Sequence, residues 1–283
     1  MRVLVTGAGG MLGRQVVLEY QRRGADVIYP THAEMDITDY RQVNTAIGKA
    51  RPDLVINCAA YTNVDKAEEE EDKAFLANGL GPRYLALACR QFATTLVHIS
   101  TDYIFDGQAS HPYQIYDIPH PINVYGASKL FGEATVREIG GNYFIARTSW
   151  LFGPGGKNFV DTILTLTRQK DELMVVNDQQ GSPTYTADLA IALADLIDSK
   201  CYGTYHITNS GVTTWFELAK KVVSATGLKT MVRPCETKDF PRPADRPALS
   251  AMNPFPLKHV IGYSLPSWEN AVERYVREIT NGG

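Results

Sequence analysis

A tyrosine and a lysine four residues apart stand out in the stretch VYGASKLFGE, residues 124–133. If this stretch is helical, Tyr125 and Lys129 lie on one face, one turn apart. A free tyrosine has a pKa of about 10, and a neighbouring ammonium favours the phenolate and lowers that pKa. Such a pair suits general acid–base chemistry on an alcohol or ketone when a cofactor carries the hydride. The alternative is that both side chains are exposed and adjacent by chance.

Three glycines at regular spacing follow the first apolar segment, in VTGAGGMLG at residues 5–13. Gly7 can form a tight turn, Gly10 can let the backbone approach a pyrophosphate, and Gly13 can let a helix pack closely on a strand. The free N–H groups at the start of that helix would bind the anion. Strand, glycine triplet and helix in this order predict dinucleotide binding rather than a plain tight turn.

Hydroxyl groups follow the fourth apolar segment, in STDYIF at residues 100–105. Open parallel sheets bind ligands at the carboxyl ends of their strands, which is where this stretch would lie. A hydroxyl of Ser100 or Thr101 could hydrogen-bond the same carbonyl oxygen that Tyr125 protonates. We therefore expect these residues and Lys129 to act together in proton transfer.

A parallel sheet would bring these residues together, and the first half of the chain has the pattern of one. Short apolar segments alternate with longer helical ones, and the expected strands are residues 2–7, 26–30, 53–60, 94–100 and 142–150. Continuous rather than alternating apolar residues indicate strands that are buried on both faces. Regular alternation of strand and helix predicts an α/β fold with a Rossmann-type doubly wound parallel sheet.

The pattern loosens after Trp150, which indicates a second, smaller part. Residues 172–178 have the composition of a further strand, and residues 203–209 are expected to form one more strand of the main sheet. Residues 238–256 have the composition of an ordered Pro-rich loop. We therefore predict two domains. The dinucleotide-binding domain comprises residues 1–150 and 171–208, and the C-terminal α/β substrate-binding part comprises residues 151–170 and 209–283. The substrate would lie in the cleft between them.

Composition excludes several classes of function. A formal net charge of −3 gives no reason to expect a nucleic-acid partner, and no apolar run approaches the ~20 residues of a membrane span. The four cysteines form no close pair and the six histidines have no metal-ligand spacing, so we expect reduced thiols and no metal site. These features predict a cytoplasmic protein.

The end of the second strand bears on which dinucleotide binds. A carboxylate there would bind the ribose 2′-hydroxyl and repel a 2′-phosphate. This chain has Pro30, Thr31 and His32 at that point, so we expect NADPH, with NADH tolerated. Asp36 is placed to hydrogen-bond the adenine amine.

Longer motifs carry a resemblance to a known family. The glycine triplet, the strand-end hydroxyl and the Tyr-x-x-x-Lys pair resemble the extended short-chain dehydrogenase/reductase superfamily. More specific stretches are similar to the dTDP-4-dehydrorhamnose reductase family: NCAAYTNVDKAE, STDYIFDG, YGASKLFGE, ARTSWLFG, DQQGSPTYTADLA and RPADRPALS. The resemblance implies reduction of the 4-keto group of dTDP-4-dehydro-β-L-rhamnose with NAD(P)H, the last step in making dTDP-L-rhamnose.

The family's functional positions match residues of this chain. The resemblance implies that Thr101 polarises the carbonyl, that Tyr125 donates the proton, and that Lys129 assists Tyr125 and binds the nicotinamide ribose. The implied cofactor contacts are Gly10, Met11 and Leu12 beside the turn glycines Gly7 and Gly13, with Asp36 and Ile37 at the adenine and Ala59, Ala60 and Tyr61 after the third strand. The implied sugar contacts are Thr101, Asp102 and Trp150.

A dTDP sugar carries a diphosphate, so an acidic protein needs a local cation to bind it. Arg246, in the Pro-rich loop, is the candidate, and its alternative is a solvated loop charge. Trp150 also has an alternative, as a core aromatic that closes a strand. Its expected place at a strand's carboxyl end favours contact with a sugar or base.

One position departs from the family pattern. Some members dimerise around a magnesium ion held by glutamates, one of them two residues after the third glycine. This chain has the neutral Gln15 there. We therefore expect no magnesium-bridged dimer, and a monomer or weak homodimer instead.

Two other functions fit the same fold. One is another nucleotide-sugar epimerase, dehydratase or 4-ketoreductase; a 4,6-dehydratase usually has two acids after the strand-end threonine, whereas here Asp102 is followed by Tyr103. The other is a non-catalytic NADP-binding regulatory subunit, such as the β subunit of methionine adenosyltransferase, which resembles this fold. The intact Thr101, Tyr125 and Lys129 argue against a regulatory subunit, since regulation does not require proton transfer.

Overall fold

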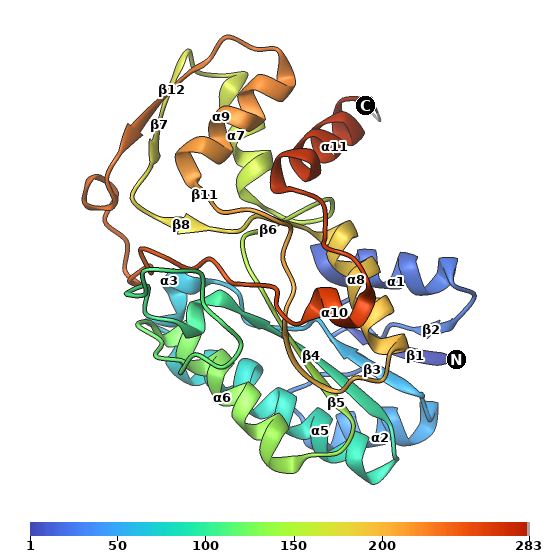
Figure 1. The fold of residues 1–283 in the computed structure, drawn as a ribbon. Helices are drawn as coiled ribbons and strands as arrows, with labels where there is room; N and C mark the ends of the chain where they lie inside the picture. Colours follow the sequence, from blue (N-terminus) through green and yellow to red (C-terminus); the bar gives the residue numbers. More distant parts are fainter. Residues whose placement is uncertain (282–283) are drawn as a thin grey trace.

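The computed structural model describes residues 1–281, and its centre is a six-stranded parallel sheet in the order β10-β5-β4-β3-β1-β2 (Figure 1). Its strands are β1 (Arg2–Thr6), β2 (Asp26–Ile28), β3 (Leu54–Asn57), β4 (Thr95–Thr101), β5 (Tyr143–Thr148) and β10 (Gly203–His206). The chain moves outward from β1 to β2 and then crosses back to β3. The topological switch point therefore lies between β1 and β3, where such sheets bind ligands.

Helices cover both faces of this sheet (Figure 1). On one face lie α1 (Met11–Arg22), α8 (Thr186–Asp198) and α10 (Leu257–Ile261); on the other lie α2 (Tyr40–Ala50), α5 (Gly81–Gln91) and α6 (Val124–Ile139). Each face has its own apolar core, and strand residues such as Val5, Ile56 and Val97 are fully buried. The predicted doubly wound α/β fold is confirmed.

A smaller part has a separate apolar core, built by α7 (Phe159–Thr167), α9 (Trp215–Thr226) and α11 (Trp268–Asn281). It contains a two-stranded parallel sheet of β7 (Glu172–Val176) and β12 (Met231–Cys235). The prediction had placed residues 172–178 with the dinucleotide-binding domain, but this pairing puts β7 with the smaller part. The physical reason is that β7 alternates exposed and buried residues, as a strand with one face in solvent does, and cannot be buried between two helix layers. β10 pairs with β5 in the main sheet, as predicted.

Short strands and a long loop connect the two parts. β6 (Leu151–Phe152) pairs with β9 (Thr184–Tyr185), and β8 (Gln180–Gly181) pairs with β11 (Thr213–Thr214). The Pro-rich loop runs beside β8, because the Gln180 N–H donates to Ala248 O at 2.8 Å and the Ser250 N–H donates to Gln180 O at 2.7 Å. Shorter helical segments are α3 (Val64–Ala67), α4 (Glu71–Phe75), η1 (Leu76–Leu80), η2 (Asp102–Ile104) and η3 (Thr237–Asp239). Within residues 1–281, every helix is too short or too polar to cross a membrane.

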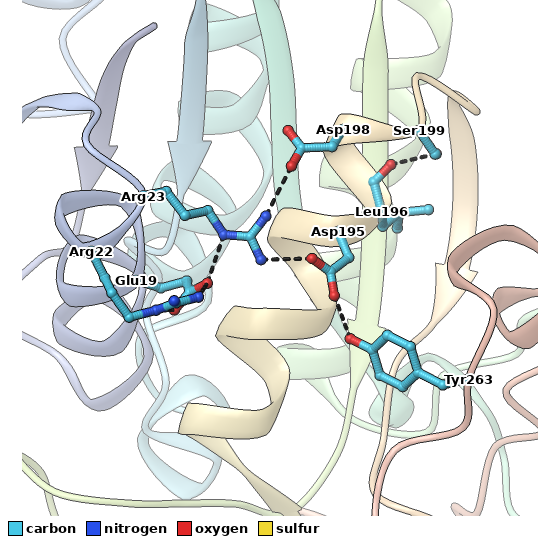
Figure 2. A network of polar contacts seen from close by, with 8 residues as sticks. All are labelled: Glu19, Arg22, Arg23, Asp195, Leu196, Asp198, Ser199 and Tyr263. Atoms are coloured by element: carbon cyan, nitrogen blue, oxygen red, sulfur yellow. Dashed lines mark hydrogen bonds and ion pairs between the residues drawn. The ribbon is translucent and has the colours of Figure 1, made fainter.

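Arg23, at the end of α1, joins this helix to α8 (Figure 2). Its guanidinium lies 2.6 Å from Glu19 on α1, and 2.6 Å from Asp195 and 2.8 Å from Asp198 on α8. The Tyr263 hydroxyl donates to the other oxygen of Asp195 at 2.6 Å. Because α1 begins at the glycine turn, this network holds the helix whose N-terminus faces the switch point.

Candidate active site

The glycine turn between β1 and α1 has no room for larger side chains. Gly7 has φ +64°, and a Cβ there would lie 2.6 Å from the Ala59 nitrogen; a Cβ at Gly13 would lie 2.2 Å from the Gly7 oxygen. Gly10 is the N-cap residue of α1, whose first turn contains no acidic side chain. The turn thus leaves an uncovered, positively polarised helix N-terminus, which fits the pyrophosphate of a dinucleotide.

Two glycines on α6 allow this helix to approach the sheet closely. A Cβ at Gly126 would lie 2.0 Å from the Tyr103 oxygen, just after β4. A Cβ at Gly132 would lie 2.1 Å from the Asn78 oxygen in η1. Any larger residue at either position would push the helix outward. The close approach brings the helix face that carries the tyrosine–lysine pair to the carboxyl end of β4.

The three predicted catalytic residues lie together at that point. Thr101 and Lys129 are buried, and the Tyr125 hydroxyl is within hydrogen-bonding reach of Thr101. The Thr101 hydroxyl donates to an oxygen of Asp102 at 3.0 Å. The Lys129 ammonium donates to the backbone carbonyl of Ile99 at 2.5 Å. The structure therefore brings the Thr101 hydroxyl and the Tyr125 phenol together and places Lys129 in the lining of the same cavity, while their catalytic roles stay predictions.

The ionisation of Tyr125 differs from the prediction. Burial raises the pKa of Tyr125 to about 12; the hydrogen bond with Thr101 opposes this shift, and the negative charge of Asp102 adds to it. The expectation that Lys129 lowers the pKa of Tyr125 is wrong for this structure, because its ammonium is hydrogen-bonded to Ile99 and the phenol has lost hydration. Tyr125 is consequently protonated across the neutral range.

Two other groups of the site titrate near neutral pH. Burial lowers the pKa of Lys129 to about 8, although the nearby acidic groups of Glu133 and Cys58 raise it. Burial raises the pKa of Asp102 to about 6, although the hydrogen bond that it accepts from Thr101 lowers it. Shifts of this size, caused by burial beside specific partners in a cleft, are typical of functional sites.

These side chains line an open cavity of about 560 Å³, in the size range of small-molecule and cofactor sites. Most predicted site residues contribute to its lining: Gly7, Gly10, Met11, Leu12, Gly13, Ala59, Ala60, Thr101, Asp102, Tyr125, Lys129 and Trp150. Trp215 of the smaller part lines the same cavity. Residues predicted to contact the cofactor and residues predicted to contact the sugar therefore share one space.

Three residues predicted to bind the cofactor lie outside this lining. The Tyr61 hydroxyl donates to Glu70 at 2.7 Å. Asp36 accepts hydrogen bonds from the N–H and the hydroxyl of Thr38, at 2.9 and 2.8 Å, and Ile37 is a buried core residue. The cofactor contacts of these three residues stay predictions.

Arg246 lies at the edge of the site and is already ion-paired. Its Nη1 is 2.6 Å from an oxygen of Asp65 on α3, and its guanidinium lies beside the phenol of Tyr103, which lines the cavity. Only 17% of the Arg246 side chain is exposed. It is therefore not a freely solvated loop charge, and a diphosphate would have to share it with Asp65.

Trp150 and Trp215 form a stacked pair in the cavity wall. Their ring centroids are 3.5 Å apart and their planes differ by 5°. Trp150 has φ +47°, a strained conformation for a bulky residue, and a Cβ on Gly181 would lie 2.3 Å from its indole ring. The Trp215 indole N–H donates to Gln179 at 3.1 Å. Strain of this kind is retained where the surrounding structure enforces it, commonly at functional sites.

Several cavity-lining residues received no role from the sequence: Cys58, Tyr103, Gly156, Lys157 and Trp215. The Gly-rich stretch LFGPGGKNF was a usable signal for Lys157, since a Cβ on Gly156 would lie 2.6 Å from Met11 Cγ and the stretch therefore covers the glycine turn. No sequence signal pointed to Trp215, because its contact with Trp150 joins positions far apart in the chain.

The neutral residue that departs from the family pattern is half-buried on α1. Gln15 follows the glycine turn directly, on the first turns of this helix. Within residues 1–281, no three His, Cys, Asp or Glu side chains come close enough together to hold a metal ion.

Comparison with known proteins gives consistent matches over the whole chain. The model of the family described as "RmlD substrate binding domain" matches residues 1–281. A dTDP-4-dehydrorhamnose reductase of Streptomyces griseus is 44% identical and covers 89% of this chain and 85% of its own length. The spore coat polysaccharide biosynthesis protein SpsK of Bacillus subtilis is 42% identical, with 98% and 97% covered.

A solved structure is similarly close. The dTDP-4-dehydrorhamnose reductase of Bacillus anthracis in complex with NADP superposes with a TM-score of 0.95 at 43% identity, covering 98% of this chain and 99% of that one. With the family model matched over residues 1–281, this chain belongs to the RmlD substrate-binding domain family.

Proposed function

We propose that this chain is a dTDP-4-dehydrorhamnose reductase, which reduces the 4-keto group of dTDP-4-dehydro-β-L-rhamnose to give dTDP-L-rhamnose. The observation that carries the proposal is the single cavity in which Thr101, Tyr125 and Lys129 lie next to the glycine turn. The names of the relatives support the substrate, and SpsK supports a role of the product in a surface polysaccharide.

The cofactor is NADPH, which supplies the hydride when bound. The backbone N–H groups of Gly10, Met11 and Leu12 at the start of α1 would hold its pyrophosphate. The relative in complex with NADP supports this choice. Residues 30–32, after β2, include no carboxylate that would repel a 2′-phosphate. NADH is expected to be accepted as well.

Tyr125 would give its proton to the keto oxygen as C4 is reduced. Its pKa of about 12 supports this role, because the phenol carries a proton throughout the neutral range. The Thr101 hydroxyl, which here donates to Asp102, would donate to the same keto oxygen. The Lys129 ammonium would then stabilise the phenolate that remains after transfer.

The sugar nucleotide would lie between the sheet and the smaller part. Trp150 and Trp215 offer an apolar wall for the sugar, and Asp102 offers a buried carboxyl group for its hydroxyls. Arg246 would contribute a guanidinium to the diphosphate, and Lys157 provides a further cation at the cavity.

The competing functions are less well supported by the site. A dehydratase would need a second acid after Asp102, and the chain has Tyr103 there. A regulatory subunit would not need a buried ammonium and a protonated phenol at the end of β4, since both are costly to bury and serve proton transfer. An epimerase would convert its sugar nucleotide without net consumption of NADPH. Measuring NADPH consumption therefore distinguishes an epimerase from a reductase.

We further propose a cytoplasmic monomer or weak homodimer that does not depend on magnesium. The neutral Gln15 supports this proposal, since a glutamate at that position holds the metal in some members of the family. Light scattering after size exclusion, with magnesium and with EDTA, tests it. A stable dimer that EDTA dissociates would contradict it.

The function is tested by offering dTDP-4-dehydrorhamnose with NADPH to the purified chain. Oxidation of NADPH at 340 nm and formation of dTDP-L-rhamnose by NMR are expected. UDP-galactose and dTDP-glucose serve as substrates of the competing epimerase and dehydratase. Turnover of either of those, with no reduction of the 4-keto sugar, would overturn the proposal.

A further inference from the structure

A fully buried carboxylate lies one helical turn beyond Lys129. Glu133 is 0% exposed and occupies the same face of α6 as Lys129 and Tyr125, four and eight residues further along. The Arg147 guanidinium binds both of its oxygens, at 2.9 and 2.8 Å, and Arg137 donates to one of them at 2.7 Å. An unpaired carboxylate would be costly at this depth, so the two arginines are what keep Glu133 ionised.

Arg147 is itself held from several sides. It lies on β5 directly opposite Ser100 of β4, and its guanidinium sits over the Phe105 ring at 5.5 Å. Its Nη1 lies 3.3 Å from the ring nitrogen Nε2 of His206 on β10, and burial lowers the pKa of His206 to about 3. The imidazole is therefore neutral and can accept from Arg147. This arrangement fixes the carboxylate of Glu133 in one position.

The surroundings of Lys129 offer few other negative charges. Its ammonium donates to the Ile99 carbonyl, and burial together with the positive charge of Lys129 keeps the pKa of His98 on β4 well below its usual value. The Cys58 thiol after β3 is protonated at neutral pH, because burial raises its pKa to about 12. Glu133 is then the one ionised acid, among residues 1–281, that raises the pKa of Lys129, and burial opposes it.

Building on the proposed reductase function, we propose that Glu133 is a positioning residue: its carboxylate, held by Arg147 one helical turn from Lys129, keeps the Lys129 side chain in its charged, protonated form. In this view the Glu133–Arg147 ion pair serves the catalytic lysine, and its contribution to the stability of the protein is secondary. Burial of an ammonium without a nearby anion would instead favour the neutral amine, which cannot stabilise a phenolate. Glu133 touches neither substrate nor reacting atoms.

The direct test is a pH titration of Lys129 by NMR, in the chain without substrate. The 13Cε resonance of Lys129 is identified by its absence in Lys129→Met. In Glu133→Gln the midpoint is expected to fall by about one pH unit or more, since the loss of a nearby opposite charge shifts a pKa by about that amount. Glu138→Gln is the matched control, because Glu138 lies on the same helix but is exposed and pairs with Arg83. Its midpoint should equal that of the wild type.

Activity gives the second readout. In Glu133→Gln the alkaline limb of the kcat–pH profile should move to lower pH by the same amount, with KM little changed. Glu133→Asp keeps the negative charge, so its profile should lie close to that of the wild type. If Glu133→Gln does not fold, the double variant Glu133→Met with Arg147→Met removes the pair as a unit, which proteins often tolerate, and should show the same fall. An unchanged Lys129 midpoint in a folded variant overturns the inference. Failure of the wild type to reduce the keto sugar overturns the proposed function alone, because the NMR titration does not use substrate.

Discussion

On the sheet side of the cavity, Thr101 and Lys129 are positioned by backbone. On the side formed by the smaller part and the Pro-rich loop, called the opposite side below, Trp215 and Arg246 depend on contacts with other side chains. Thr101 ends β4, and Lys129 lies on a helix whose glycines set its distance from the sheet. Trp215 is held by its stack on Trp150, and Arg246 by its ion pair with Asp65.

The difference separates two kinds of contribution to function. Groups fixed by a sheet and a closely packed helix have little freedom, which suits the fixed geometry that proton transfer requires. Groups fixed by side-chain contacts can rearrange when those contacts are exchanged for ligand contacts. Substitutions on the sheet side should therefore change kcat, and substitutions on the opposite side should change KM.

The largest expected effect is on the sheet side. Tyr125→Phe removes the proton donor and leaves the glycine turn intact. General acid catalysis contributes about 10²–10⁴-fold, so kcat should fall by about that factor while NADPH affinity is kept. Steady-state kinetics and fluorescence titration with NADPH measure the two quantities. Nearly full activity of the variant would remove Tyr125 from the mechanism.

On the opposite side, Arg246→Ala should raise KM for the dTDP sugar about ten- to hundredfold and leave kcat and NADPH affinity unchanged. A charge-assisted hydrogen bond to the diphosphate is worth about 1.5–3 kcal/mol, which corresponds to that factor. Asp65→Asn is the matched control, because it breaks the same ion pair but leaves the guanidinium for the diphosphate. A similar rise in KM in both variants would show that Arg246 acts only through the loop.

The pH dependence of kcat should report the ionisation of Lys129, on the sheet side of the cavity. Lys129 is protonated below its pKa of about 8 and loses its charge as the pH rises through that value, whereas Tyr125, with a pKa of about 12, stays protonated. kcat should therefore fall by up to about tenfold per pH unit above pH 8. A kcat that stays level to pH 10 would contradict a role for the charged lysine.

A smaller effect is expected from Gly181→Ala. The new methyl group would lie 2.3 Å from the Trp150 indole, so the indole must shift and the stack on Trp215 must loosen. Overpacking costs about 1–3 kcal/mol, and we expect a lower melting temperature with KM for the sugar raised about fivefold or more. kcat should change little. A fall in kcat with KM unchanged would place Trp150 on the catalytic side of the comparison.

The smallest expected effect is a change in hydrogen exchange that depends on ligand binding and not on catalysis. Binding of dTDP-rhamnose should slow hydrogen exchange in the loop of residues 238–256, which carries Arg246 and is hydrogen-bonded along β8. NADPH alone should have little effect there, because the loop contacts β8 and Asp65 on α3 and not the glycine turn. Mass spectrometry of the exchanged peptides compares the two ligands. Equal exchange with and without the nucleotide sugar would place its binding site elsewhere.

The two sides also differ in how far the sequence could predict them. The strands of the main sheet, the glycine turn and the tyrosine–lysine pair follow from local patterns, because strand ends and helix faces are set by residues close in the chain. The prediction that residues 172–178 belong to the dinucleotide-binding domain was wrong for β7, because the composition of a strand does not determine which strand it pairs with. The Asp65–Arg246 pair and the Trp150–Trp215 stack join distant positions, and no local pattern specifies such contacts.

Burial is the other quantity that local patterns do not give. The sequence places Lys129 one turn from Tyr125, which predicts a lowered tyrosine pKa in water. In the structure burial raises the pKa of Tyr125 and lowers that of Lys129, and Lys129 is not among the groups that shift the pKa of Tyr125. The identity of the catalytic pair could therefore be predicted, but the direction of the tyrosine shift could not.

The stacked indoles have a practical consequence. The chain contains three tryptophans, and two of them form this pair in the cavity wall. Parallel indoles at 3.5 Å couple their electronic transitions, so their near-ultraviolet circular dichroism differs from that of an isolated ring. The third, Trp268, is buried in the core of the smaller part and provides a constant background. The protein thus carries its own optical probe of this cleft, and compounds that enter it can be screened without a label, a coupled enzyme or the keto sugar.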